Sequence, residues 1–305
     1  MGGYGGWAPE NKPGIVPLRP LGLGEILDGA FTLIRRYPRV TLGLSALIAS
    51  ISGGIRLLID LGLGEIPTFD PNATDTGTGF GDTAAVTFSA ASIVALLLST
   101  MLTFILVGML TVVAGEAILG RPITAGETWA RIRPRFMGLI GLSFLASVLP
   151  YLGLIGFIVF GVFLWGKLAL AVPAYVLERI GPIDALRRSW RLVQGNWWRV
   201  FGIRLLGSII VSFISTILMV PFFIGAIATT GIFTGDEPSG TPIGFLVLTT
   251  VGQIIAETIA TPLMAGILVL LYVDRRMRAE ALDVALVAAA GSAPPAPPAP
   301  SAPSA

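Results

Sequence analysis

The fold is decided by the stretch VTFSAASIVALLLSTMLTFILVGMLTVVAGEAIL, residues 86–119, whose only ionisable side chain is that of Glu116. About 20 apolar residues in a helix cross the roughly 30 Å hydrocarbon core of a bilayer, so this run predicts a transmembrane helix. The composition agrees, because 54% of the 305 residues are hydrophobic and only 12% are charged. A soluble domain carries about a quarter charged residues. The length alone would suggest two soluble domains, but the apolar runs predict an all-α integral membrane protein instead.

Further apolar runs flank this stretch on both sides. Residues 136–176 are too long for one span, so we expect a tight turn at residues 150–153 to divide them into two. The predicted spans cover residues 40–63, 86–119, 136–151, 152–176, 200–233 and 243–273. The sequence therefore predicts a polytopic bundle of six transmembrane helices.

The charges of the connecting segments alternate along the chain. Residues 64–85 and 235–242 contain acidic side chains and no Lys or Arg, whereas the connections on the other side are rich in arginine. Basic residues are enriched in cytoplasmic loops, so we expect both termini in the cytoplasm. The preference for Arg over Lys, with abundant Ala, Gly and Pro, is typical of a GC-rich bacterial genome. The predicted location is therefore the bacterial plasma membrane.

The predicted membrane domain covers residues 21–285. Residues 1–20 are expected to form a flexible cytoplasmic head, and the Pro- and Ala-rich residues 286–305 a disordered tail. Within the membrane domain an amphipathic segment precedes each pair of spans. The sequence therefore predicts three repeats of one surface helix and two spans, at about residues 21–119, 120–177 and 178–273.

The amphipathic segments come into register when Phe31 is aligned with Trp129 and Trp190. The apolar face of the first is formed by Leu23, Leu27, Ala30, Phe31 and Ile34, and that of the third by Ile183, Leu186, Trp190 and Val193. Such helices lie in the membrane interface and offer their arginines to anionic lipid headgroups. The candidate lipid-binding residues are Arg35, Arg36, Arg131, Arg133, Arg187, Arg188 and Arg191. Two roles fit these arginines, membrane anchoring with the setting of topology or recognition of a specific lipid, and anchoring is the more general effect.

The chain contains neither His nor Cys, and this excludes several kinds of chemistry. A His-based catalytic triad, an imidazole or thiolate metal ligand and a thiolate nucleophile are all ruled out. Any catalysis would rest on carboxylates, Lys, Tyr or hydroxyls, and without a dense carboxylate cluster an intramembrane enzyme is the least favoured function. We therefore predict no enzymatic activity, no metal and no cofactor. The arginine clusters follow the membrane topology, so they do not indicate binding of nucleic acid.

Ionisable side chains within the predicted spans are candidate functional residues, because each costs at least about 2.5 kcal/mol at the bilayer centre unless it is paired or hydrated. Lys167 lies well inside the fourth span and Glu257 near the middle of the sixth, with Gln253 one helical turn away. We expect Lys167 and Glu257 to form a buried ion pair between the two spans. Such a pair would be either a structural lock or a coupling site for protons or substrate, and a lock is the more frequent outcome.

Other charged side chains lie nearer the ends of the spans. Arg56 and Asp60 are four residues apart on the first span, close enough to pair on one helix face and to reach the surface. Glu116 ends the second span and Arg204 begins the fifth, and from these positions both could reach water.

The sixth span is expected to continue as a solvated helix after it leaves the membrane. Asp274 and Arg278, and likewise Arg276 and Glu280, are four residues apart and therefore spaced to form ion pairs along one face. Exposed pairs of this kind contribute little stability.

Three stretches carry a family likeness: PLRPLGLGEILDGAF at residues 17–31, VPAYVLERIGPIDALRRSWRLVQGNWWRVFGI at residues 172–203 and LLYVDRRMRAEALD at residues 270–283. They resemble the membrane domain that is often attached to glycerophosphoryl diester phosphodiesterases and that also occurs alone in bacteria. The phosphodiesterase itself is a separate soluble barrel that uses histidines and metal-binding carboxylates, and this chain has neither room for the barrel nor a histidine. The resemblance therefore implies a stand-alone membrane module, with no catalytic residue carried over.

Two functions fit these features. The first is a non-enzymatic integral membrane scaffold or accessory protein, whose partners are a bilayer with anionic headgroups and a second protein in the membrane. The alternative is a small transporter or lipid-handling protein that uses a Lys167–Glu257 pair at the membrane midplane. A protein that copurifies in stoichiometric amount would favour the scaffold, whereas a polar cavity that reaches both residues would favour transport.

Overall fold

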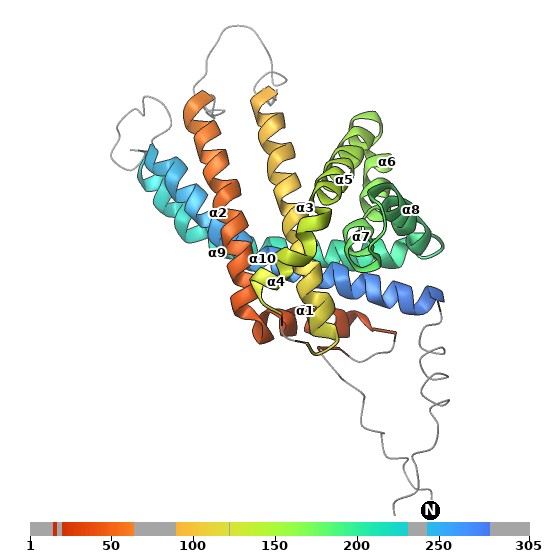
Figure 1. Ribbon diagram of the computed structural model, residues 1–305. Helices are drawn as coiled ribbons and strands as arrows, with labels where there is room; N and C mark the ends of the chain where they lie inside the picture. Colours follow the sequence, from red (N-terminus) through yellow and green to blue (C-terminus); the bar gives the residue numbers. More distant parts are fainter. Residues whose placement is uncertain (1–14, 17–19, 64–89, 122, 231–242, 281–305) are drawn as a thin grey trace, which may run out of the picture.

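The computed structural model describes residues 15–16, 20–63, 90–121, 123–230 and 243–280 (Figure 1). All regular structure within these ranges is helical. Most of the predicted head, the predicted acidic connections at residues 64–85 and 235–242, and the predicted tail at residues 286–305 lie outside the described residues. Within the predicted flexible head, Ile15 and Val16 are buried against the hydrophobic core.

The helices follow one another with few intervening residues wherever the chain is described. Their bounds are α1 Leu23–Arg36, α2 Pro38–Leu63, α3 Ala90–Ile118, α4 Ala125–Ile132, the 3-10 turn η1 Arg133–Arg135, α5 Phe136–Gly156, α6 Ile158–Lys167, α7 Ala171–Glu178, α8 Pro182–Val193, α9 Trp197–Ala228 and α10 Ile243–Glu280. Within the described residues, six segments are long and apolar enough to cross a membrane: Pro38–Leu61, Leu97–Ile118, Ala125–Gly153, Ile158–Glu178, Trp197–Ala228 and Ile243–Ala279. The predicted all-α bundle of a multi-pass membrane protein is thereby confirmed, whereas the threefold repeat stays a prediction.

Local sequence explains where the short helices begin. At the start of α1, the Glu25 carboxylate accepts a hydrogen bond from the backbone N–H of Gly22 at 2.7 Å. At the start of α4, the Thr124 hydroxyl accepts from the N–H of Glu127, whose carboxylate accepts from the N–H of Thr124 in return. These contacts satisfy donors that the first turn of a helix leaves without partners. Pro134 then leads the chain through η1 into α5.

The turn between the third and fourth spans lies at Phe157, so the predicted turn at residues 150–153 is wrong. α5 continues through Pro150, and the N–H of Phe157 donates to the carbonyl of Gly153 at 2.8 Å. Proline is tolerated inside membrane helices when neighbouring groups satisfy the freed backbone, so a Pro–Gly pattern does not fix a turn there. Next to the turn, a Cβ on Gly153 would lie 3.0 Å from the Cα of Gly161. The α5–α6 hairpin therefore depends on glycine at this contact.

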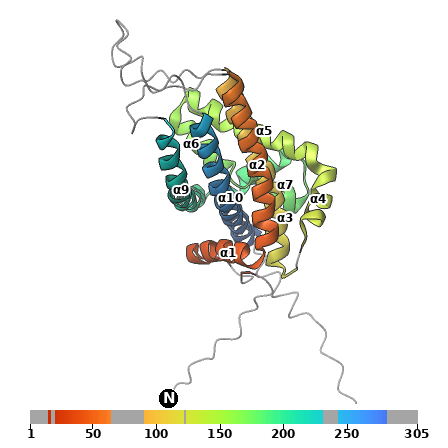
Figure 2. The same cartoon turned by 90° about the vertical axis from the view of Figure 1, so that its left-hand side faces the viewer.

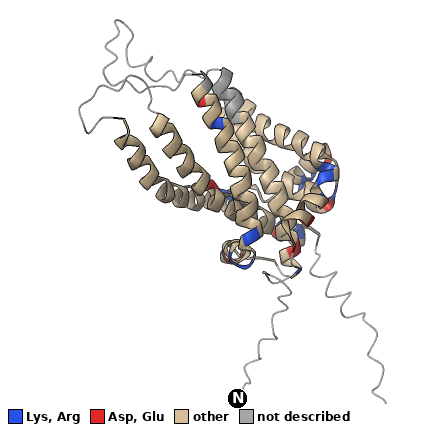
Figure 3. Ribbon diagram, turned by 60° about the vertical axis from the view of Figure 1, so that its left-hand side comes forward, with Lys and Arg blue, Asp and Glu red and all other residues tan. Residues whose placement is uncertain are grey.

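The buried core is concentrated at one end of the bundle. We call this the basic end, and define it as the end where α1 lies, where α3 and α10 finish and where α9 begins. Fully buried residues occur in the last half of α3 and of α10, among them Leu110, Val113, Leu270 and Leu271. The charged residues gather towards this end, and the spans are largely uncharged (Figure 3). From the basic end α2, α3 and α5 diverge (Figure 1), and large apolar side chains of the outer part of α2, such as Leu58 and Leu61, are exposed.

α1 lies across the basic end, at a steep angle to the spans (Figure 2). It packs on α10 through a face whose buried residues are Ile26, Gly29, Ala30 and Leu33. The predicted apolar face is offset from this one, because only Ala30 belongs to both, while Leu23 and Phe31 are exposed. The apolar surface of α1 is therefore only partly covered, because Leu27 and Ile34 pack against the core while Leu23 and Phe31 stay exposed.

α8 packs into the bundle, which differs from the predicted helix lying only on its surface. It contacts α5, α6, α7 and α10, and its buried residues are Ala185, Ser189, Leu192 and Val193. Of the predicted apolar face only Val193 belongs to this set, and Ile183 and Trp190 are exposed. The small side chains of Ala185 and Ser189 allow the close approach, and a search for large apolar residues overlooks them.

Candidate functional site

The fourth span is broken in its interior, between the end of α6 at Lys167 and the start of α7 at Ala171. A helix end leaves up to four carbonyl groups without partners. At membrane depth no water is available to satisfy them, so broken helices occur only where protein supplies the hydrogen bonds. The break therefore identifies a place where polar side chains from other helices must converge.

Three side chains from α8 and α9 supply these hydrogen bonds. The Ser189 hydroxyl donates to the carbonyl of Lys167 at 2.7 Å and accepts from the N–H of Leu170 at 3.2 Å, so it joins both sides of the break. The guanidinium of Arg204 donates through Nη1 to the carbonyl of Trp165. The indole of Trp197 donates to the carbonyl of Phe163, one turn before the end of α6, at 3.4 Å.

Lys167 and Glu257 are not brought together, and the predicted buried ion pair is not among those formed by the described residues. Lys167 is 6% exposed, and its Nζ lies 5.0 Å from the ring centroid of Trp190 and 5.5 Å from that of Phe163. The Glu257 carboxylate instead accepts a hydrogen bond from Gln253 of its own helix at 2.9 Å. The cause is the helix break, which ends α6 against α8 and leaves the lysine over aromatic rings.

Arg204 is buried, contrary to the expectation that it could reach water. The residue is 9% exposed, and its guanidinium carbon lies 3.9 Å from the ring centroid of Trp165. Its Nε has no hydrogen-bond partner, and within the described part of the chain no carboxylate pairs with it. Among the residues that the structure describes, the positive charge is met by one carbonyl and one aromatic face.

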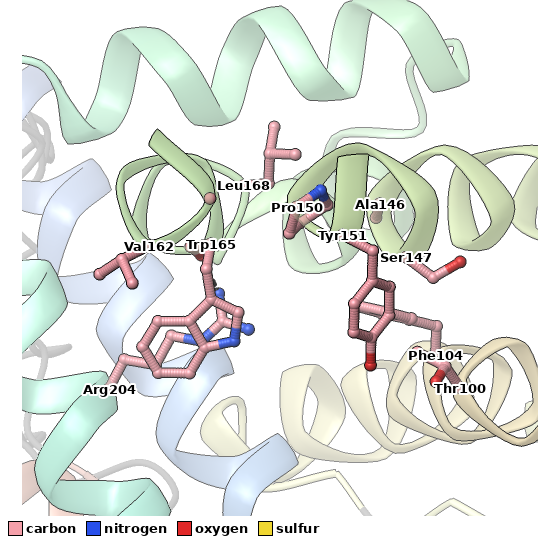
Figure 4. Close-up of a pocket in the computed structure, with 11 residues that line it drawn as sticks. Thr100, Phe104, Ala146, Ser147, Pro150, Tyr151, Val162, Trp165, Leu168 and Arg204 are labelled. Atoms are coloured by element: carbon pink, nitrogen blue, oxygen red, sulfur yellow. Dashed lines mark hydrogen bonds between the residues drawn. The ribbon is translucent and has the colours of Figure 1, made fainter. Parts of the chain in front are cut away.

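A cavity of about 290 Å³ lies beside Arg204 (Figure 4). Arg204 and Trp165 form one wall, and Ser147 and Tyr151 of α5 form the wall across from them. The remainder of the lining is mostly apolar and comes from α3, α5 and α6. Sequence reasoning selected Arg204 but not this cavity, because its walls come from α3, the α5–α6 hairpin and α9, three parts of the chain that are far apart in sequence.

Asp274 forms a second polar cluster at the basic end and is fully buried. Its carboxylate accepts hydrogen bonds from the N–H of Leu21 at 2.9 Å, from Arg278 at 2.7 Å and from Arg199 at 3.1 Å. Both arginines also donate to the carbonyl of Leu21. The contact predicted from the spacing of Asp274 and Arg278 is confirmed. The helix does continue here, but the prediction that this part of it is solvated is wrong at Asp274, which is fully buried. Arg199 and Leu21 were missed, since nothing in their local sequence indicates a distant partner.

Several of the candidate lipid-binding arginines pair within the protein. Arg188 donates to Glu178 at 2.8 Å, and Glu178 also accepts from the hydroxyl of Tyr272. Arg131 pairs with Glu116. The remaining candidates are exposed: Arg35, Arg36, Arg133, Arg187 and Arg191, of which Arg187 lies 3.7 Å from Asp184.

At the end of the bundle away from the basic end, Arg56 and Asp60 approach each other to 3.9 Å. Both side chains are accessible, so the predicted pairing on one helix face is confirmed. This contact is an isolated surface pair, and pairs of this kind contribute about 0–1 kcal/mol.

Comparison with known proteins gives one match. Residues 37–275 match the model of a domain of unknown function, DUF7847. The matched range begins immediately after α1 and includes the Arg204 cavity and Asp274. No curated protein and no solved structure matches the chain.

Proposed function

The chain belongs to the DUF7847 family, and we propose that it is a non-enzymatic integral membrane scaffold or accessory protein, held at an anionic membrane surface through α1. The observation that carries this proposal is the partly covered apolar surface of α1. The helix packs on α10, and next to this contact Leu23 and Phe31 are exposed at the basic end. A helix fixed to the bundle in this way presents a permanent apolar surface in the plane of the interface.

The charges of α1 support contact with anionic lipid. Arg35 and Arg36 are both exposed in its last turn, on the side of the bundle where the other arginines gather. Each basic residue near an anionic leaflet contributes about 1 kcal/mol of binding free energy. Under the positive-inside rule this leaflet is the cytoplasmic one, which would leave both termini in the cytoplasm of a bacterium.

The resemblance of residues 172–203 to the membrane domain attached to glycerophosphoryl diester phosphodiesterases fits an accessory role, because a module of that kind acts beside another protein. A second protein in the membrane is therefore part of the proposal. The transport alternative based on a Lys167–Glu257 pair receives no support from the geometry, since the two side chains bind other groups.

Labelling at single cysteines tests the placement of α1. The chain has no cysteine of its own, so Phe31→Cys and Asp28→Cys each introduce one unique site for a spin label. In nanodiscs that contain anionic lipid, we expect the label at position 31 to be relaxed by oxygen dissolved in the lipid. The label at position 28, which belongs to the polar face, should be relaxed by a water-soluble nickel complex. Equal exposure of both labels to water would contradict the proposal.

The role of charge and the existence of a partner need separate experiments. The double variant R35Q/R36Q should lose the stabilisation that anionic lipid gives the wild type, and R56Q, at the opposite end, should keep it. Crosslinking in the native membrane, followed by purification in mild detergent, should yield a stoichiometric partner. A chain that is recovered alone under these conditions would contradict the scaffold role while leaving the placement of α1 intact.

A further inference from the structure

We infer that the cavity beside Arg204 binds a lipophilic anion, an apolar chain that carries a compact carboxylate or phosphate head, with the head on the guanidinium. This inference does not depend on the proposed role of α1. It rests on the charge of Arg204, on the shape and lining of the cavity and on the depth of the cavity in the bundle.

The charge of Arg204 lacks a partner of opposite sign in the described structure. Arg204 is 9% exposed, its Nε makes no hydrogen bond, and its Nη1 donates to a single carbonyl, that of Trp165. A guanidinium has five N–H donors in a planar fork, and capping one helix carbonyl uses only one of them. A glutamine or lysine could cap a carbonyl equally well. The remaining donors have the geometry that suits a carboxylate or a phosphate.

The neighbouring groups hold the guanidinium in place. Its carbon lies 3.9 Å from the centroid of the Trp165 ring. The same residue, in the last turn of α6, also supplies the carbonyl to which Arg204 donates. The C-terminus of a helix carries a partial negative charge, which lowers the cost of the buried cation but does not neutralise it. An arriving anion would therefore meet a positive group that is already oriented.

The cavity is large enough for a small anionic head and too small for a large one. Its volume of about 290 Å³ is at the lower limit of the pockets that bind small molecules, which begin at about 300 Å³. Across from Arg204, the hydroxyl of Tyr151 makes no hydrogen bond among the described residues and can donate to an oxygen of the head (Figure 4). Phe104, Val162 and Leu168 line the cavity with apolar surface, which suits the first carbons of an attached chain.

The depth of the cavity favours an anion with an apolar chain over one that is free in water. Arg204 is seven residues after the start of α9 at Trp197, so it lies about 10 Å along the helix from the basic end. Tyr151 and Val162, which line the cavity, are exposed on flanks of α5 and α6 that the membrane would cover. An anionic head carried by an apolar chain can enter from the lipid between these helices. A free, fully hydrated ion would first have to lose its water to follow the same path, so it is disfavoured.

Thermal unfolding of the full chain in a non-ionic detergent tests the inference. Dodecyl phosphate and laurate, each below its critical micelle concentration, should raise the unfolding temperature in a saturable way. Dodecanol, which has the same chain without charge, should give no saturable shift, and inorganic phosphate at the same concentration should give none either. An equal shift with dodecanol would overturn the requirement for an anion, and an equal shift with inorganic phosphate would overturn the requirement for a chain.

Three variants locate the binding. R204Q removes the cation, and V162W fills the mouth of the cavity while leaving Arg204 in place; both should abolish the shift. K167Q removes another buried cation that does not line this cavity, so it should keep the shift. If R204Q does not fold, V162W decides the question. A saturable shift that persists in V162W, or the absence of any shift in the wild type, would overturn the inference.

Discussion

The carboxylate of Asp274, near the end of α10, accepts a hydrogen bond of 2.9 Å from the backbone N–H of Leu21, which precedes α1. The two residues are 253 positions apart, and the contact closes the basic end of the bundle. Leu21 contributes only its backbone to this contact, while its side chain is fully buried in the core, so packing also restricts the residue at that position. The matched family range includes Asp274 and excludes Leu21, so the acidic partner lies inside the family domain and the donor outside it.

We expect Asp274→Asn to destabilise the protein strongly. Asp274 is fully buried and balances the charges of Arg199 and Arg278, whose side chains are each 35% exposed. The loss should therefore lie towards the lower end of the about 3–5 kcal/mol that removing one partner of a fully buried ion pair costs. The measurement is the unfolding temperature in detergent. Asp60→Asn is the matched control, because Asp60 forms an accessible pair with Arg56 and should cost about 1 kcal/mol or less. Equal effects of the two substitutions would show that Asp274 is not the centre of a buried cluster.

The break in the fourth span leads to a prediction at Ser189. Its hydroxyl binds the carbonyl of Lys167 and the N–H of Leu170, so Ser189→Ala leaves two buried backbone groups without a partner. Each such group costs about 1–3 kcal/mol, and we expect the unfolding temperature to fall accordingly.

Thr103→Ala provides the control for Ser189. The Thr103 hydroxyl donates to the carbonyl of Ser99, at 2.9 Å, on an exposed face of α3. That carbonyl can keep its own helical hydrogen bond, so the stability of this variant should stay close to that of the wild type. A stable Ser189→Ala variant would mean that the α6–α7 break is supported in another way.

Two glycines of α5 should respond in opposite directions to substitution by alanine. A Cβ on Gly153 would lie 3.0 Å from the backbone of Gly161, so Gly153→Ala should push α5 and α6 apart and cost about 1–3 kcal/mol. A Cβ on Gly141 meets no atom within 4 Å, so Gly141→Ala should stabilise the protein by about 0.4–1 kcal/mol. Urea or thermal unfolding of both variants in the same detergent provides the comparison. A loss of stability at Gly141 as large as that at Gly153 would contradict the close packing of the α5–α6 hairpin.

The sequence predicts the spans well because hydropathy is a local property of the chain. The long apolar runs give six segments able to cross a membrane, and the pairs Arg56–Asp60 and Asp274–Arg278 follow from helical spacing alone. These features need no knowledge of which helices lie side by side. The same local rules fail where a distant group decides the outcome.

The predictions that proved wrong share one cause, which is that a residue distant in sequence decides the local structure. The position of the turn at Phe157 depends on close contact between α5 and α6, and the break after Lys167 depends on a serine from α8. The environment of Lys167 follows from that break. The burial of Asp274 depends on a backbone group at Leu21. None of these partners lies within one helical turn, so no periodic pattern in the sequence reports them.

Additivity of substitutions tests whether Lys167 pairs with Glu257 or lies over the rings of Trp190 and Phe163. If Lys167 and Glu257 formed an ion pair, Lys167→Met and Glu257→Gln would be coupled. The double variant would then lose less unfolding free energy than the two single variants lose together. In the structure the lysine lies over Trp190 and Phe163 and the glutamate binds Gln253, so the two side chains share no partner. Substitutions at such sites add to within about 0.5 kcal/mol. A second cycle with Arg188→Met and Glu178→Gln calibrates the experiment, because these residues are joined by a 2.8 Å hydrogen bond and should show a coupling of about 0.5–3 kcal/mol. Coupling of Lys167 to Glu257 as large as in the second cycle would restore the ion pair, and with it the transport alternative.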